Sequence, residues 1–289
     1  MDTTAVVSTA VKPPRSRSRL AGAFRHKSLA IGVVLIVIVL AVVIIGPFLN
    51  SHNPDAVNPG AAFDAPSAAH PFGTDSFGRD MLSRVETGGR YTIAAAVVVV
   101  LLGGVVGIAL GIVAGYFRGA VGFVIMRLMD LLLAFPGLLL ALTAAAILGT
   151  GLTNGVLALA IIAVPAYARV AEGATIEIRN RPYIDAATSV GVNPFTMITR
   201  HVLPNVRDDL LVLTSSWIGL SALWIAALGF IGLGVQPPTP EWGTLLAGGQ
   251  DYLSVAWWIT TFPGIFLALF VIGTNLIGDG LRDHFDKTL

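Results

Sequence analysis

Cysteine and charged residues are what this sequence most clearly lacks. None of the 289 residues is cysteine, and only 12% are Asp, Glu, Lys or Arg. The absence of cysteine excludes disulfide bonds, thiol catalysis and cysteine-ligated metal sites. Soluble domains carry about 25% charged residues. The shortage of charge, together with 55% hydrophobic residues and a mean hydropathy of +0.79, therefore indicates a membrane protein.

Signatures of catalysis are missing as well. The sequence has neither a G-x-x-x-x-G-K-S/T phosphate loop nor a G-x-S-x-G nucleophile elbow. The acidic residues Asp75, Asp80 and Glu86 alternate with basic ones, which suits local salt bridges better than an acid–base pair. We therefore expect no enzyme, and the energy for any active transport has to come from another chain.

Groups that relay protons or bind metal ions are also scarce. A proton-driven carrier needs Asp, Glu or His at membrane depth, and the apolar cores of the long uncharged runs contain none. The histidines fall in expected tails or loops without the spacing of metal ligands. We therefore expect no metal site and no cofactor on this chain, although it has five histidines: His26, His52, His70, His201 and His284.

Long uncharged runs dominate what the sequence does contain. A membrane-spanning helix needs about 20 apolar residues, so four of the runs hold one span each. The remaining run, residues 131–168, has 38 residues and holds two spans, with a turn at Gly149–Gly151 and Asn154. The sequence predicts an all-α membrane protein with six transmembrane helices. The runs cover residues 28–54, 91–117, 131–168, 210–240 and 252–278.

Basic residues predict how the chain is oriented. With the N-terminus in the cytoplasm, 15 of the 18 Lys and Arg residues lie inside and 3 outside, as the positive-inside rule requires. The first apolar segment is too long for a signal peptide, so we expect it to be retained. The expected parts are a disordered basic cytoplasmic tail (1–28), a first transmembrane helix (29–49), an extracytoplasmic loop (50–90), a core of five transmembrane helices (91–281) and a cytoplasmic C-terminus (282–289).

Four glycines recur at every fourth residue of the second expected span: Gly103, Gly107, Gly111 and Gly115. Residues four apart share one face of a helix, and small residues there let a neighbouring backbone approach closely. We expect a tight helix contact along this face, with a partner helix either in this chain or in a second subunit. Direct contact with a transported substrate is the alternative interpretation.

A polar segment over residues 169–209 lies between two uncharged runs and carries five of the 18 basic residues. Pro182 suits the first turn of a helix, where its missing N–H would be unpaired anyway. Asp185 follows in that first turn, where the helix dipole favours negative charge. Gly191 can adopt the left-handed conformation that ends a helix. We expect a short helix here, on the cytoplasmic side.

A second short helix is expected directly after the first. Asn193 and Pro194 are typical of an N-cap and a first helical residue, and Pro204 should stop the helix at Leu203. Such short helices suit docking into a groove of another protein. An ordinary amphipathic helix at the membrane surface is the other interpretation, and periodicity does not choose between them.

Within this segment lies the pattern Tyr183-Ile-Asp-Ala-Ala-x-x-x-Gly191, followed by His201-Val-Leu-Pro-Asn205. The pattern resembles the EAA loop of ABC-importer permeases, which in that family is the coupling helix in a cleft of the ATPase subunit. Asp185 stands where the family usually has Glu, so the charge is kept on a shorter arm. The resemblance implies an ATPase-coupling role for Tyr183, Asp185, Ala186, Ala187, Gly191, His201 and Pro204.

Four other segments resemble one subfamily, the C-type permease of dipeptide and oligopeptide importers: 70–84, 127–136, 230–243 and 275–283. The resemblance extends from Leu29 to the end of the chain. It implies a type I ABC importer permease fold in the cytoplasmic membrane of a prokaryote, surrounded by lipid. It also implies a heterodimer with a homologous B-type permease, two ATPase subunits that hold ATP and magnesium, an extracytoplasmic binding protein and a peptide substrate. No nucleic acid is expected.

The proline-rich outer loop after Gly234 allows two interpretations of its aromatic residues. Trp242, Tyr252, Trp257 and Trp258 fit a belt at the membrane interface, which we favour. Alternatively, Glu241, Trp242 and Gly243 contact the binding protein.

Alternatives to a peptide importer remain at this point. Related permeases with the same signatures carry nickel chelates or glutathione. A carrier coupled to sodium ions would need inverted repeats with broken helices at matching positions, and the sequence shows no convincing internal symmetry. A purely structural membrane subunit is disfavoured by the coupling pattern.

Overall fold

The structure is a computed structural model that describes residues 27–50 and 52–286. Nearly all of the basic tail expected over 1–28 lies outside the described residues. Helices make up the regular structure of the described part, and its one β-bridge joins Thr74 to Asp80. The main helices are α2 (Lys27–Leu40), α3 (Gly46–Leu49), α4 (Met81–Phe117), α5 (Gly119–Leu133), α6 (Gly137–Leu148), α7 (Leu152–Arg179), α8 (Pro182–Ser189), α9 (Pro194–Met197), α10 (Leu203–Phe230), α11 (Trp242–Gly249) and α12 (Trp258–Asp286).

Six candidate membrane spans are present, as predicted. Five helices are long and apolar enough to cross a membrane, and α5 and α6, bent by 87° at a short break, form a sixth candidate together. The break lies at Pro136, which has no N–H to donate and disfavours a helical conformation in the residue before it. The turn expected at Gly149–Gly151 is also present and separates α6 from α7.

The expected bounds of the outer loop are wrong. The loop over 50–90 ends ten residues early, because α4 begins at Met81. Asp80 caps this helix, and its carboxylate accepts a hydrogen bond from the Ser83 N–H at 2.8 Å. Charged residues of the first turns are covered by protein, since Arg84 and Glu86 are both buried. The last charged residue before the uncharged run therefore did not mark the start of α4.

The second short helix expected after Asn193 is instead the start of a long one. Residues Pro194–Phe230 form one continuous helix, in which a π-helical turn, η3 (Ile198–Val202), joins α9 to α10. Pro204 is the second residue of α10. Because it follows a shift in the hydrogen-bond register, its missing N–H is tolerated. Pro204 therefore does not end the helix.

The glycine ridge packs against α7 of the same chain, so the expected tight helix contact is confirmed and its partner helix lies in this chain and not in a second subunit. A Cβ added at Gly103 would lie 2.7 Å from the carbonyl oxygen of Ala160, and one at Gly115 would lie 2.8 Å from that of Glu172. Gly107 and Gly111 meet the carbonyl oxygens of Val164 and Ala168 in the same way. Both sets step by four residues in the same direction, so α4 and α7 run parallel in contact over several turns.

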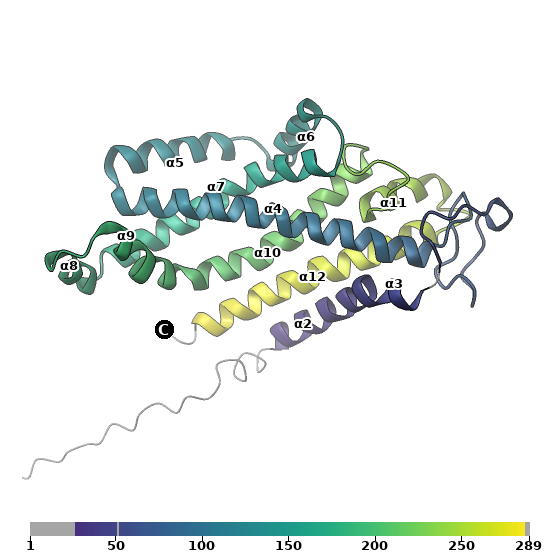
Figure 1. Ribbon diagram of the computed structural model, residues 1–289, viewed down its shortest axis with the longest axis horizontal. Helices are drawn as coiled ribbons and strands as arrows, with labels where there is room; N and C mark the ends of the chain where they lie inside the picture. The colour runs from purple at the N-terminus through teal and green to yellow at the C-terminus, as the bar shows by residue number, and fades with distance from the viewer. Residues whose placement is uncertain (1–26, 51, 287–289) are drawn as a thin grey trace, which may run out of the picture.

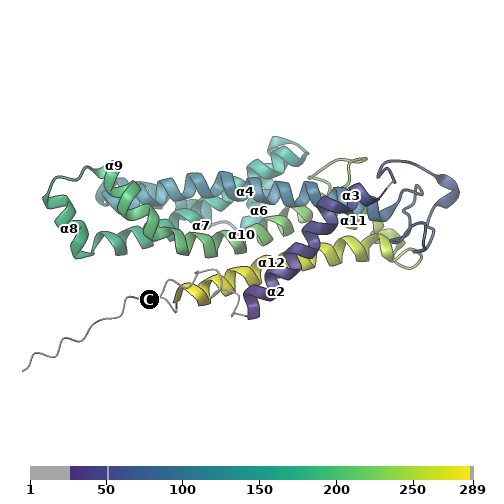
Figure 2. The same cartoon turned by 60° about the horizontal axis from the view of Figure 1, so that its bottom comes forward.

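The first helix packs on the last one. In Figure 2, α2 crosses α12 obliquely. Small residues again make the approach close, because a Cβ at Gly32 would lie 2.8 Å from the Gly273 carbonyl oxygen, and one at Gly280 would lie 2.5 Å from Leu29 Cβ. The described part of the chain is therefore an elongated bundle with two distinct ends. Figure 1 shows α8 and α9 at one end, and α3, α11 and the loop before α4 at the other.

Glu241 and Trp242 belong to the core at the α11 end, so the alternative interpretation, in which they contact the binding protein, is wrong for them. Both side chains are 0% exposed. The Glu241 carboxylate caps α11 by accepting from the Thr244 N–H at 3.1 Å, and it also accepts from the Thr92 hydroxyl of α4 at 2.7 Å. Trp242 Nε1–H donates to the Val85 carbonyl at 2.9 Å.

Close packing around this pair explains why it is buried. A Cβ at Gly89 would lie 2.6 Å from the Trp242 ring, and Gly243 is pressed on the Ala226 backbone. The proposed aromatic belt is therefore wrong for Trp242, and also for Trp258, which is buried and donates to the Thr74 carbonyl at 2.9 Å. Tyr252 and Trp257 are exposed.

Gly107→Ala is expected to destabilise the protein by about 1–3 kcal/mol, the usual cost of overpacking. The added methyl would collide with the Val164 carbonyl and lie 2.7 Å from Tyr167 Cβ. Gly173→Ala in α7 is the matched control, because nothing lies within 4 Å of its added Cβ and alanine favours a helix by about 1 kcal/mol over glycine. Thermal unfolding in detergent measures both variants. Equal midpoints for the two would contradict the α4–α7 contact.

Glu241 is expected to make stability depend on pH. Burial raises the pKa of its carboxyl, so the folded state holds the proton more tightly than the unfolded chain. This contribution is greatest below the ordinary glutamate pKa of about 4.3 and decreases as the pH rises above it. The unfolding midpoint of the wild type minus that of Glu241→Gln, measured from acidic to neutral pH, should fall as the pH rises, because glutamine does not titrate. A difference that grows with pH would argue against this sign.

Candidate functional site

The short helix α8 lies at the tip of the end away from α11 (Figure 1). Its predicted start is confirmed: Arg181 is the N-cap, Pro182 occupies the first turn and Asp185 is acidic in that turn. Inside the helix, the Thr188 and Ser189 hydroxyls donate to carbonyls one turn earlier, at 2.8 and 2.9 Å. These bonds satisfy the two hydroxyl groups within the helix itself.

The end of α8 also follows the prediction. Gly191 has φ of +85°, a conformation that glycine adopts without the penalty of a Cβ. Its N–H donates to the Thr188 carbonyl at 3.0 Å, and the Val192 N–H donates to the Ala187 carbonyl at 3.2 Å. Asn193 then caps α9 by accepting from the Thr196 N–H at 2.8 Å. The chain therefore reverses tightly between α8 and the long helix that follows.

One apolar side chain anchors α8 to the bundle. Ile184 is 3% exposed and belongs to the same core cluster as Ile178, Met197 and Val202. Ala187 is half-buried against this cluster, whereas Asp185 and Ala186 are exposed. The helix thus has an inner face fixed by isoleucine and an outer face of small and acidic residues.

The remaining expected coupling residues lie on either side of this helix. The rings of Tyr183 and His201 lie with centroids 6.3 Å apart, so the π-helical turn η3 rests beside the start of α8. Pro204 lies further along, exposed in the first turn of α10. The fold therefore gathers Tyr183, Asp185, Ala186, Ala187, Gly191 and His201 around α8, and it leaves Pro204 on the neighbouring helix.

Two large apolar side chains stand out from this tip. Val190 is 81% exposed and Phe195 is 76% exposed. They flank Gly191 on the two sides of the reversal. We call the outer face of Asp185 and Ala186, together with Val190 and Phe195, the tip surface. An exposed apolar surface with a polar rim is typical of a protein interaction site.

Polar contacts tie the base of α8 to the bundle. Arg118, between α4 and α5, donates to the Asn180 side-chain oxygen at 2.8 Å and to the Ile176 carbonyl at 3.3 Å. Arg181 pairs with Glu177 of α7 at 2.9 Å. These contacts connect the junction of α7 and α8 to the end of α4. The base of α8 is therefore held by the bundle.

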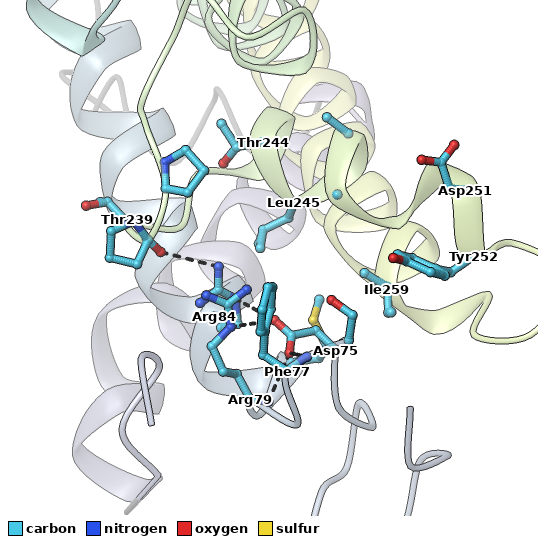
Figure 3. Close-up of a pocket in the computed structure, with 16 residues that line it drawn as sticks. Asp75, Phe77, Arg79, Arg84, Thr239, Thr244, Leu245, Asp251, Tyr252 and Ile259 are labelled. Carbon is cyan, nitrogen blue, oxygen red and sulfur yellow. Dashed lines mark hydrogen bonds and ion pairs between the residues drawn. The ribbon is translucent and has the colours of Figure 1, made fainter. Parts of the chain in front are cut away.

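A recess lies at the opposite end of the molecule. It has a volume of about 590 Å³ and is lined by residues of the loop before α4, the proline-rich loop and α11. Figure 3 shows Arg84 and Arg79 pointing to Asp75 at its base. Asp75 accepts from Arg79 Nε at 2.6 Å and lies 3.6 Å from Arg84 Nε. The local salt bridging expected of Asp75 is confirmed, and its charge is balanced.

Arg84 connects the parts of this recess. Its guanidinium donates to the Pro54 carbonyl at 3.0 Å and to the Pro238 carbonyl at 3.4 Å, and it lies 3.6 Å from the Asp55 carboxylate. The proline-rich loop is therefore held to the outer loop through one buried cation. This arrangement fixes the backbone of both loops and balances the charge of Asp75.

Sequence reasoning missed one group at this end, formed by His52, His70 and Asp80. Their nitrogen and oxygen ligand atoms lie within 4.8 Å of one another. Histidine spacing gave no hint of it, because the two histidines are 18 residues apart and are brought together only by the path of the loop. The helix start at Asp80 was missed as well, so the sequence carried no usable signal for this group.

Comparison with known proteins gives a consistent result. Residues 107–289 match the family described as binding-protein-dependent transport system inner membrane component. The chain is 43% identical over 253 residues to the probable D,D-dipeptide transport system permease protein DdpC of Escherichia coli K12, covering 88% of this chain and 85% of that protein. It is 42% identical to the glutathione transport system permease protein GsiD of Pectobacterium atrosepticum, covering 83% and 78%.

A third relative and a solved structure agree with these. The di/tripeptide transport system permease protein DppC of Pseudomonas aeruginosa is 40% identical, covering 92% of this chain and 90% of the relative. Among solved structures, the inward-facing MetNI methionine ABC transporter superposes with a TM-score of 0.59 at 19% identity, covering 71% of this chain and 97% of that one. At this identity the likeness concerns the fold.

The helical architecture and the relatives lead to one conclusion. The chain has a type I ABC importer permease fold and several membrane spans. It belongs to the family of binding-protein-dependent transport system inner membrane components, as a non-catalytic permease subunit.

Proposed function

We propose that this permease imports peptides as half of a heterodimer with a B-type permease, and that the tip surface docks on an ATPase subunit. The observation that carries the docking proposal is the combination of an anchored helix with uncovered apolar side chains. Ile184 fixes α8 to the bundle, while Val190 and Phe195 project from it. A helix that is held at its base and apolar at its tip can fill a groove and transmit a push.

Charge supports placing the tip in the cytoplasm. Among the described residues, Arg118, Arg181, Arg200 and Arg207 lie on the elements at the α8 end, whereas Arg79, Arg84 and Arg90 lie at the other end. An excess of basic residues favours the cytoplasmic side of a membrane. With six crossings, both termini of the chain would be cytoplasmic, and the recess of Figure 3 would face the binding protein.

The coupling proposal follows from how α8 is attached. Movement of an ATPase subunit against α8 would be passed to α7 through the Glu177–Arg181 pair and to α10 through η3. Because α4 is packed on α7 along the glycine ridge, these helices would move together. ATP and magnesium would be bound by the two ATPase subunits, and this chain would supply only the mechanical contact.

The cargo proposal rests on the relatives. Two of the three relatives above are named for dipeptide or di/tripeptide transport and one for glutathione, which is itself a tripeptide. A peptide is therefore the chemistry common to all three. We propose short peptides as substrates, with glutathione as the competing cargo within the same class.

Val190→Asp is expected to weaken association with the ATPase subunits by about tenfold, the effect of losing roughly 1.4 kcal/mol at an interface. The side chain is 81% exposed, so the carboxylate should not disturb folding. Val255→Asp, at a position 66% exposed at the other end, is the matched control. Co-purification of the ATPase subunits from detergent measures both, and an equal yield for the two variants would contradict docking through the tip.

Uptake of a labelled peptide by cells tests the proposed cargo. Cells that carry the complete transporter should accumulate a labelled dipeptide, and cells lacking this chain should not. Unlabelled di- and tripeptides should compete with the label. Uptake of a nickel chelate that depends on this chain, without peptide uptake or competition, would refute a peptide cargo and leave the docking proposal intact.

A further inference from the structure

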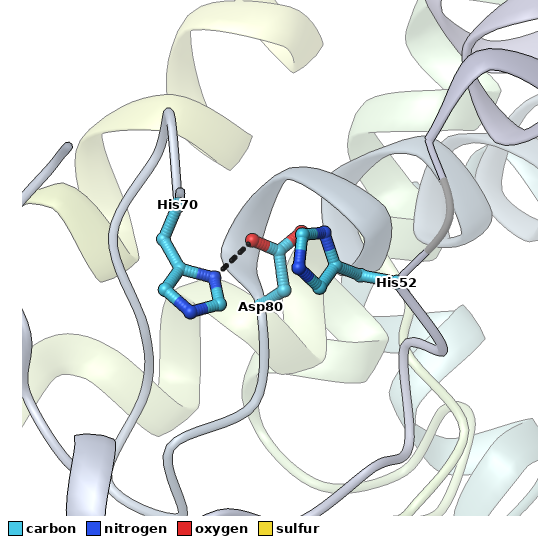
Figure 4. A group of neighbouring side chains, drawn as sticks. All are labelled: His52, His70 and Asp80. Carbon is cyan, nitrogen blue, oxygen red and sulfur yellow. Dashed lines mark hydrogen bonds and ion pairs between the residues drawn. The ribbon is translucent and has the colours of Figure 1, made fainter. Parts of the chain in front are cut away.

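Two histidines and an aspartate converge where the first helix, the outer loop and α4 meet. Figure 4 shows the rings of His52 and His70 facing the Asp80 carboxylate from opposite sides. The ring centroids lie 5.0 Å apart, and His70 Nδ1 lies 2.9 Å from Asp80 Oδ1. Asp80 is buried, His70 is half-buried and His52 is exposed. Asp80 is therefore fixed by its surroundings, whereas the His52 side chain has room to move.

The other polar atoms of the cluster are already held by neighbours. Asp80 Oδ2 accepts from the Ser83 N–H at 2.8 Å, which leaves Oδ1 directed at His70. His52 Nδ1 lies 3.0 Å from the Asn50 side-chain oxygen, and a hydrogen bond to that acceptor places the His52 proton on Nδ1. Nε2 of His52 then presents a lone pair. Partners of this kind orient the ligands of metal sites.

The distances fit a metal ion of the zinc type. Bonds of about 2.0–2.2 Å from Zn²⁺ to nitrogen and oxygen place two tetrahedral ligands roughly 3.4 Å apart. The ligand atoms here lie within 4.8 Å of one another, so an ion would have to draw them closer, and the exposed His52 is the side chain with room to move. An ion would replace the proton between His70 Nδ1 and Asp80 Oδ1, and His70 would then carry its proton on Nε2.

The route to the cluster and the chemistry of its ligands both favour a transition-metal ion. A hollow of about 400 Å³ beside the cluster is lined by His52, Asn50 and Glu86, among others. It gives a hydrated ion a path to His52 and leaves room for a water ligand. Neutral imidazoles with one carboxylate suit zinc, nickel or copper, whereas magnesium and calcium prefer oxygen ligands.

We propose that His52, His70 and Asp80 form a binding site for a divalent transition-metal ion of the zinc class, with one coordination position open to the hollow. A bound ion would clip the segment after the first helix to the outer loop and to the start of α4. The proposal concerns ion binding alone and does not depend on the peptide cargo or on docking of the ATPase.

Zn²⁺ binding to the purified transporter complex tests the site. Equilibrium dialysis should show one equivalent more per permease in the wild type than in His52→Gln or His70→Gln, and excess Mg²⁺ should not displace it. His52 is exposed and contacts Asn50, so its replacement should leave the fold intact. His284→Gln, at the end of α12, is the matched control and should keep the full stoichiometry.

Co²⁺ gives a second reading of the same site. The wild type should develop a visible absorption band on Co²⁺ addition, which His52→Gln lacks and His284→Gln retains. Unchanged Zn²⁺ stoichiometry and affinity in His52→Gln would overturn the proposal, as would a site that Mg²⁺ fills equally well. Peptide uptake is not part of the readout, so failure here is distinguishable from failure of the proposed transport function.

Discussion

The close approach of α4 and α7 is the contact on which the rest of the structure depends. Glycines of α4 face backbone carbonyls of α7 at every fourth residue of each helix. Without side chains between them, the two backbones pack directly, and van der Waals contact replaces a hydrophobic effect that lipid does not supply. One end of this parallel pair carries α8, and the other end carries the pocket for Trp242.

Features with a local physical cause could be predicted from the sequence. Uncharged runs marked the spans because the bilayer excludes charge, and Pro182 and Gly191 marked α8 because each suits one position of a helix. Pro204 misled the prediction because a proline was assumed to end a helix, whereas the π-helical turn before it shifts the register. The effect of Pro204 depends on a backbone adjustment that its own sequence neighbours do not reveal.

The rest depends on contacts between distant segments. Trp242 was assigned to an interfacial belt because several aromatic residues lie in and after its loop, yet Gly89 on α4 makes the space that buries it. The same limit applies to His52 and His70, which meet only because the loop between them folds back. For the glycine ridge, the sequence predicted a tight contact and left its partner open. Identifying α7 required the fold.

Glu241 constrains the order in which the chain assembles in the membrane. Its carboxylate finds its partners on α4 and α11 and lies against Gly229 at the end of α10. Those surfaces come together only after the helices have been synthesised and packed. Burying a carboxyl group without hydrogen bonds is costly, so burial of α11 is favourable only where Thr92 of α4 is in place to donate to the Glu241 carboxylate. Docking of α11 therefore depends on the position of α4.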